Sequence, residues 1–210
     1  MEKKKVYNLI ILDESGSMQS IKNMIISGLN EVVQTIKGVA EQFPEQEHFV
    51  SFYSFNALGT KTHLSLKPAK ELHELDGKNY RPTSGTPLFD AMGFSINQLR
   101  DQIKAEENSN VLVTILTDGM ENASKEYDRK AIKALIEELE EENWTFTYIG
   151  TDHNVEDFAV SISIKNTLRF KKDSAGLREM FAKEGRSRRA YSRKLRENKS
   201  TKEDYFSDEA

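Results

Sequence analysis

The sequence contains no cysteine among its 210 residues. Disulfide bonds and thiol chemistry are therefore excluded. The absence fits a reducing compartment without requiring one. The sequence also lacks the GxxxxGK[ST] and GxGxxG patterns that cradle phosphate groups, so no nucleotide-binding loop is predicted.

No apolar run is long enough to cross a bilayer, which takes about 18 residues. The run from Val6 to Leu12 includes Asn8 and ends at Asp13. The basic segment Met1 to Lys5 precedes it, as in a signal peptide, but no small-residue cleavage site follows. We therefore predict neither a signal peptide nor membrane association, and we expect a cytoplasmic protein.

Neither sign of charge dominates the composition. Lys and Arg number 30 and Asp and Glu number 34, so the net charge of −4 indicates no general class of partner. Hydrophobic residues make up 37% and charged residues 30%, which is typical of a globular protein. The length supports one domain with a short extension, and the sequence shows no internal repeat.

The first apolar run opens into a polar loop. Val6 to Leu12 is aliphatic and β-branched, which predicts a strand buried on both faces. Asp13, Ser15 and Ser17 follow at alternate positions, and Gly16 permits a tight turn between them. In an open α/β sheet, ligands bind at the rim formed by the carboxyl ends of the strands. Carboxylate and hydroxyl oxygens suit a hard cation such as Mg2+.

Two further stretches carry matching oxygens. RPTSGTPLFDAM, residues 81–92, places Thr86 in a Gly-Thr-Pro turn that opens a helix. NVLVTILTDG, residues 110–119, is a second buried strand that ends near Asp118. Together with the first loop, these stretches resemble the metal-ion-dependent adhesion site of the von Willebrand factor type A domain family. The resemblance runs over about residues 6–170, and five motif positions match: Asp13, Ser15, Ser17, Thr86 and Asp118.

The resemblance implies how a metal would be held. Ser15, Ser17 and Thr86 would be direct ligands, and Asp13 and Asp118 would act through bound water. The metal would be Mg2+, with Mn2+ or Ca2+ as alternatives. Neutral hydroxyls leave much of the metal's charge uncompensated, so its open position would attract an acidic or phosphorylated residue of a partner protein.

Strands and helices alternate along the chain. The expected helices cover residues 18–41, 87–103, 127–142 and 155–161, and the expected strands cover 6–12, 48–55, 61–66, 111–117, 144–150 and 167–170. This alternation predicts a mostly parallel sheet with helices on both faces. The resemblance implies a three-layer α-β-α, Rossmann-like fold with six strands, one of them an antiparallel edge strand. Asp13 and Asp118 would then end the two strands that flank the topological switch point.

Each site residue also has a purely structural interpretation. Ser15 and Ser17 could cap the following helix, and Thr86 could cap the helix that starts at Pro87. Asp118 could belong to an Asp-Gly turn. The joint occurrence of these residues at the ends of two buried strands favours the metal site.

Other polar residues lie near the same rim. Glu14, Glu121 and Asn122 occur in the predicted loops, where they either shape the rim or are simply solvated. Asp152 and His153 follow the predicted strand 144–150 and would face the same rim, although a single histidine there is more often incidental.

The last forty residues differ in charge from the rest. Residues 183–199 hold eight Lys or Arg and two Glu, a local charge of 8 − 2 = +6. Apolar residues predict a helix from about Ser174 that packs on the sheet at its start. We expect a domain over residues 1–172, a basic helix over 173–199 that packs on or extends from it, and a disordered tail over 200–210.

The expected function is a non-enzymatic, metal-dependent protein-binding module. The forms DESGSM and GTPLFDAM, without attached domains, resemble small stand-alone bacterial members of the family of the tellurite-resistance-linked type. Those relatives work beside kinases and phosphatases. The resemblance therefore implies a role in a bacterial stress or phospho-signalling system.

Two alternatives belong to other classes. A metal-dependent phosphohydrolase would use Asp13 as nucleophile, but such enzymes place a general acid two residues later, where this chain has Ser15. No lysine is evident near Asp118 in the sequence. Nucleic-acid binding would use the basic stretch 183–199, but such a stretch is more often a solvated helix or a protein-docking arm.

Overall fold

The apolar runs form a single six-stranded sheet in the computed structural model, which describes residues 3–106, 108–151 and 154–207. Its strands are β1 (Lys4–Asp13), β2 (Gln46–Asn56), β3 (Gly59–Pro68), β4 (Ser109–Leu116), β5 (Trp144–Gly150) and β6 (Asn166–Arg169). They lie in the order β3-β2-β1-β4-β5-β6, and β3 pairs with β2 in the antiparallel sense while the other neighbours are parallel. The predicted mostly parallel sheet with one antiparallel edge strand is confirmed.

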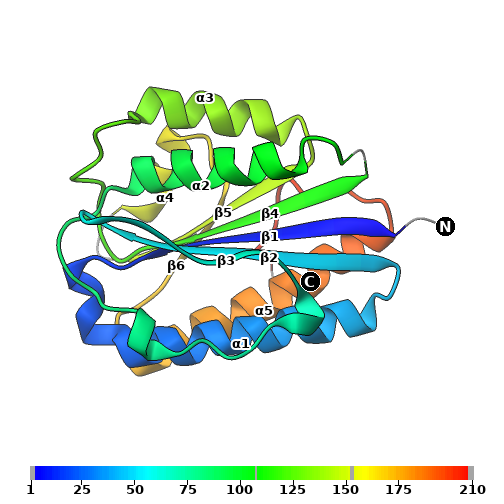
Figure 1. The fold of residues 1–210 in the computed structure, drawn as a ribbon, viewed down its shortest axis with the longest axis horizontal. Coiled ribbons are helices and arrows are strands. Elements are labelled where there is room, and N and C mark those ends of the chain that lie inside the picture. Colours follow the sequence, from blue (N-terminus) through cyan, green and yellow to red (C-terminus); the bar gives the residue numbers. More distant parts are fainter. Residues whose placement is uncertain (1–2, 107, 152–153, 208–210) are drawn as a thin grey trace.

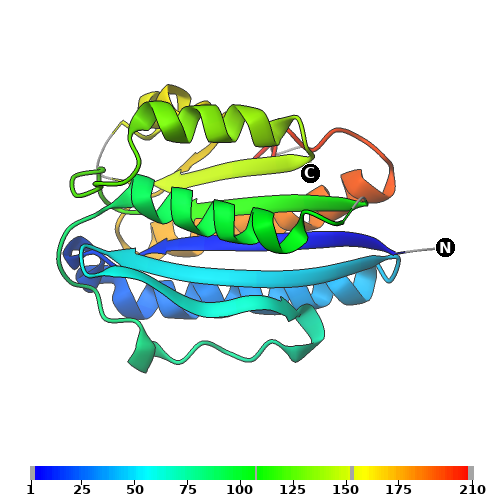
Figure 2. The ribbon, with the colours of Figure 1, turned by 45° about the horizontal axis from the view of Figure 1, so that its top comes forward.

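Helices cover both faces of this sheet, as Figures 1 and 2 show. The α-helices are α1 (Lys22–Gln42), α2 (Leu88–Ile103), α3 (Arg129–Glu140), α4 (Val155–Ser161) and α5 (Ser174–Arg196). Three short 3-10 helices are η1 (Gly16–Ile21), η2 (Ala69–Glu71) and η3 (Gly77–Asn79). In Figure 1, α1 and α5 lie below the sheet and α2, α3 and α4 lie above it, which gives the three predicted layers.

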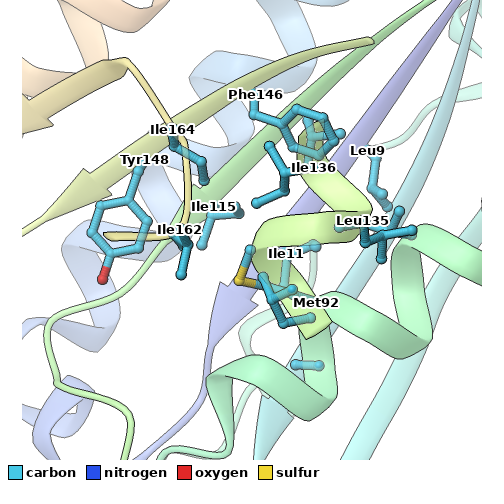
Figure 3. Packing of buried hydrophobic residues seen from close by; sticks show 14 of the residues in the cluster. Leu9, Ile11, Met92, Ile115, Leu135, Ile136, Phe146, Tyr148, Ile162 and Ile164 are labelled. Carbon is cyan, nitrogen blue, oxygen red and sulfur yellow. The ribbon is translucent and has the colours of Figure 1, made fainter. Parts of the chain in front are cut away.

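Alternate side chains of β1 supply the two halves of the core. Leu9 and Ile11 point to the face covered by α2 and α3, where they pack with Met92 and Ile136 (Figure 3). Leu12 points to the other face, under α1 and α5. Both faces of the central strand are apolar because a parallel sheet in the middle of three layers is buried on both sides.

A buried polar cluster lies under the second half of α5. We define this Arg188 cluster by residues from two strands, the helix and the C-terminal segment: Asn8, Thr114, Glu184, Arg188 and Tyr205. The Arg188 guanidinium, 1% exposed, donates to Asn8 Oδ1 at 2.6 Å, to Thr114 Oγ1 at 3.0 Å and twice to Glu184 Oε1. The buried charge is therefore paired and hydrogen-bonded within the chain.

This cluster changes the expectation for the basic stretch. We predicted that the helix from Ser174 packs on the sheet at its start, but its buried positions continue to Leu195. Arg188, one of the eight basic residues, points inward. Helix α5 therefore belongs to the packed layer along its whole length.

The chain after Ser200 differs from the predicted disordered tail over its described part, 201–207. Thr201 is 7% exposed and Tyr205 is 4% exposed. The Tyr205 hydroxyl donates to Glu184 Oε1 at 3.3 Å, and the Tyr205 N–H donates to Asn166 Oδ1 at 3.0 Å. The segment is ordered here because its aromatic ring and backbone find buried partners, which its polar and acidic composition does not reveal.

The order of the strands places a crevice at one rim of the sheet. The chain leaves β1 for β2 on one side and later returns to β4 on the other side, so β1 and β4 flank the topological switch point. Asp13 is the last residue of β1, and Asp118 comes just after β4. Both therefore lie where the resemblance implied. None of the helices in the described ranges combines the length and apolar character needed to span a bilayer.

Candidate metal site at the sheet rim

Three loops meet at the switch point and are tied together by backbone hydrogen bonds. The Gly16 N–H donates to Ser84 O at 3.0 Å, and the Thr83 N–H donates to Glu14 O at 2.9 Å. The Asn122 N–H donates to Thr86 O at 3.1 Å. These bonds join the loop after β1, the loop before α2 and the loop after β4. The three segments singled out in the sequence therefore lie side by side at this rim.

Asp13 is held rigidly among these three segments and is fully buried. One of its carboxylate oxygens accepts from the Ser15 N–H at 2.7 Å, and the other accepts from the Thr117 hydroxyl at 2.6 Å. The Tyr80 hydroxyl donates to the Asp13 backbone oxygen at 2.7 Å. Thr117 has no role in the sequence prediction, although its place directly before Asp118 could have suggested one.

The oxygens of the other loops gather around Asp13. Ser15 Oγ and Ser17 Oγ are 3.1 Å apart, and the Ser17 hydroxyl donates to Asp118 Oδ1 at 2.5 Å. A Cβ placed on Gly119 would lie 3.2 Å from Thr86 Oγ1, 3.7 Å from Ser17 Oγ and 3.8 Å from Asp13 Oδ2. We name the five residues that the structure brings together here the rim cluster: Asp13, Ser15, Ser17, Thr86 and Asp118.

The capping roles that could explain these residues are not observed. Ser15 precedes η1 but its hydroxyl makes no capping hydrogen bond. The N-cap of α2 is Pro87, one residue after Thr86, and it has no side-chain cap. The turn at Gly119 is closed by the Thr117 hydroxyl, which accepts from the Gly119 N–H at 3.1 Å, and not by Asp118. The hydroxyls of Ser15 and Thr86 therefore have no helix-capping function.

Glu14, Glu121 and Asn122 shape the rim through hydrogen bonds to its loops, although Asn122 is exposed. Glu14 is buried and accepts hydrogen bonds from the Ser54 hydroxyl and the Arg81 N–H. Glu121 accepts from the Phe89 N–H at the start of α2, and Asn122 Oδ1 accepts from the Thr86 N–H at 2.9 Å. These side chains fix the loops, and their carboxylate and amide oxygens are occupied in doing so.

A lysine lies beside the rim cluster, which corrects the sequence analysis. Lys172 Nζ is 2.6 Å from Asp118 Oδ2, and the Lys172 side chain is 23% exposed. Lys172 follows β6, whose carboxyl end lies at the same rim as those of β1 and β4 because these strands run parallel. The sequence signal that could have indicated this lysine was its position shortly after a short parallel edge strand.

Burial affects the protonation of the central carboxylate, Asp13. Burial raises the pKa of Asp13, and the charge of nearby Asp118 adds to the rise. Hydrogen bonds from Thr117 and Ser15 act in the opposite direction. Two buried acidic side chains so close together repel each other, and a cation between them would relieve that repulsion.

The donor set determines which cation fits. In the described part of the chain no three His, Asp or Glu side chains gather as a metal-binding group, and the rim cluster has two carboxylates and three hydroxyls. An all-oxygen set with few charges suits a hard divalent cation that retains water, such as Mg2+, and does not suit a soft metal. Asp152 and His153, which the sequence placed at this rim, lie outside the described residues.

The fold and the rim cluster together define a class of α/β protein that carries an oxygen-rich site at its switch point. The chain belongs to the von Willebrand factor type A domain family, whose profile matches residues 9–192. Domains of this family typically serve in adhesion or protein binding and are usually non-catalytic. A search of curated proteins gave no match.

Solved structures share the fold at low sequence identity. The pilus adhesin SpaC from Lactobacillus rhamnosus GG, in its open conformation, is 13% identical with a TM-score of 0.64, covering 89% of this chain and 30% of that one. Proximal thread matrix protein 1 from the mussel byssus is 12% identical with a TM-score of 0.55, covering 86% and 45%. The chain therefore spans less than half of either protein, and the likeness concerns the fold alone.

Proposed function

We propose that this protein is a non-enzymatic binding module that engages a partner protein through a divalent metal. Ser15, Ser17 and Thr86 would hold Mg2+, or Mn2+ or Ca2+ in its place, and Asp13 and Asp118 would orient it through water. The bound metal supplies a positive centre that takes an acidic or phosphorylated side chain of the partner. The observation that carries the proposal is the convergence of Thr86, Ser17 and Asp13 oxygens beside Gly119.

The kind of partner follows from the resemblance of the motifs. The forms DESGSM and GTPLFDAM resemble the small bacterial members linked to tellurite resistance, which work beside kinases and phosphatases. We extend the proposal to a partner in a bacterial stress or phospho-signalling system. The cytoplasmic location expected from the sequence stays a prediction.

Co-purification from a lysate of the source organism tests this function. The bait is the whole chain, in Mg2+ and in excess EDTA, with the variants Asp13→Ala, Thr86→Ala and Ser17→Ala. Ser20→Ala is the matched control, because Ser20 is an exposed serine of the same 3-10 helix outside the rim cluster. We expect a partner that is captured in Mg2+ by the wild type and the control, and lost in EDTA and with the three variants. A partner retained in all conditions would contradict a metal bridge.

The enzymatic alternative gains one observation from the structure. Lys172 beside Asp118 supplies the lysine that a phosphohydrolase needs at this place. The general acid is still lacking, because Ser15 stands where that carboxylic acid would be. Hydrolysis of p-nitrophenyl phosphate that is abolished by Asp13→Ala would favour the enzyme over the binding module.

The structure changes the nucleic-acid alternative, which would use the basic stretch 183–199, at one position. Arg188 is buried on Glu184, so the two charges cancel inside the protein. Without this pair the stretch keeps seven Lys or Arg and one Glu, a local charge of 7 − 1 = +6, which is the same as the count from the sequence. Binding of RNA that persists without the rim cluster and weakens steeply with salt would favour this alternative over the binding module.

A further inference from the structure

A groove begins beside the rim cluster and runs along the start of α5. It has a volume of about 760 Å³ and lies between the end of β6, the connection to α5 and the first turns of that helix. Among its lining residues, Phe170 and Met180 are buried in the core. The charged residues that line it are Arg169, Lys171, Lys172, Asp173, Glu179 and Lys183.

The charge of this groove is opposite to that of the whole chain. Four cationic and two anionic side chains line it, and with Asp118, which pairs with Lys172, the net charge is 4 − 3 = +1, against −4 for the protein. One of the two acids, Asp173, accepts from the Gly176 N–H at 2.8 Å as the N-cap of α5. Arg169 and Lys171 are exposed at the groove. An anionic ligand is therefore the complementary occupant.

The groove is continuous with the rim cluster through Lys172. This side chain lines the groove, and its ammonium is 2.6 Å from Asp118 Oδ2. A ligand whose acidic group reached the metal held by the rim cluster would therefore pass directly into a positively charged surface.

We propose that the groove binds an acidic segment of the partner protein, several Asp or Glu carboxylates long, next to the side chain that reaches the metal. This inference rests on the proposed function and names the chemistry of the partner. The cations extend from β6 to Lys183 on α5, and from Ser174 to Lys183 the helix axis alone rises about 14 Å. That length matches about four residues of an extended peptide and exceeds a single phosphoryl group.

Fluorescence anisotropy with fluorescein-labelled hexaglutamate tests the groove in the whole protein with Mg2+. The groove variant is Arg169→Glu with Lys171→Glu. The control is Arg178→Glu with Arg186→Glu, two exposed arginines of α5 that do not line the groove. Both double variants change the net charge equally. We expect at least a tenfold loss of affinity for the groove variant and less than a twofold loss for the control.

The same titrations in EDTA and with Thr86→Ala separate this inference from the proposed function. Loss of affinity in the groove variant, but not in EDTA, would support the groove and contradict the metal bridge. Equal affinity of the groove and control variants, with loss in EDTA, would overturn the groove and leave the metal bridge standing. Failure of the wild type to bind hexaglutamate, or tighter binding of a short phosphoserine peptide at the groove, would overturn the acidic-segment proposal.

Discussion

Two polar clusters lie against the same two strands, and they differ in where their partners come from. The Arg188 cluster takes Asn8 from β1 and Thr114 from β4, and its charges, Arg188 and Glu184, pair with each other inside the protein. The rim cluster takes its central carboxylate, Asp13, from the end of β1 and its second, Asp118, from the loop after β4.

The rim cluster is not closed in this way. Its two carboxylates face each other across hydroxyls, Ser17 is exposed, and the neighbouring cation is the half-buried Lys172. Polar residues in or directly after a buried strand can therefore serve either stability or binding. Where the chain itself pairs the buried charges, the cluster serves stability, and where a polar group such as the Ser17 hydroxyl stays exposed beside buried carboxylates, the cluster offers a binding site.

The largest effect is expected from breaking the closed cluster. Arg188→Ala leaves the Glu184 carboxylate buried without its cation, and Asn8 and Thr114 lose a hydrogen-bond donor. We expect the free energy of unfolding to fall by about 3–5 kcal/mol. Equilibrium unfolding in urea measures the change.

Arg186→Ala is the control for this experiment, because Arg186 is an exposed arginine of the same helix. Its effect should stay within about 0.5 kcal/mol. Similar stabilities of the two variants would mean that the Arg188 cluster does not hold α5 on the sheet.

A smaller effect on stability is expected from pH. It concerns His48, whose pKa is influenced by the buried charge of Arg188. Burial, together with the charge of Arg188, lowers the pKa of His48 from 6.5 to about 4. The unfolded chain therefore binds a proton in this window that the folded protein does not. Stability is complete above pH 6.5 and falls by about 3 kcal/mol as the pH drops to 4, of which about 2 kcal/mol is lost by pH 5.

Urea unfolding at pH 7 and pH 5 checks this prediction. His48→Gln should lose less stability than the wild type between the two pH values. His73→Gln is the control, because His73 is exposed, and it should behave as the wild type does. Equal pH dependence in all three proteins would show that His48 is not held neutral by its surroundings.

The sequence was sufficient for the architecture because hydrophobic periodicity is a local signal. The alternation of Leu9 and Ile11 with Ile10 and Leu12 indicates a strand buried on both faces, and these side chains divide between the two halves of the core. The inward position of Arg188 could not be predicted in this way. Asn8 and Arg188 are 180 residues apart in the chain, and neither shows locally that the other is its partner.

The rim cluster was predictable for a different reason. Asp13 and Asp118 directly follow apolar strands, and the carboxyl ends of neighbouring parallel strands must meet at one rim. Thr117 and Lys172 were missed because their contacts depend on side-chain directions and on the far edge of the sheet. The ordered contacts of Tyr205 were missed because a polar, acidic composition argued for disorder.

Isothermal titration with Mg2+ tests the central claim most directly, that the open cluster binds a divalent cation and the closed cluster does not. The wild type should bind one Mg2+, Thr86→Ala should bind it at least tenfold more weakly, and Thr114→Val in the Arg188 cluster should bind it as the wild type does. Absence of Mg2+, Mn2+ and Ca2+ binding to the wild type, or equal binding by Thr86→Ala, would contradict the account.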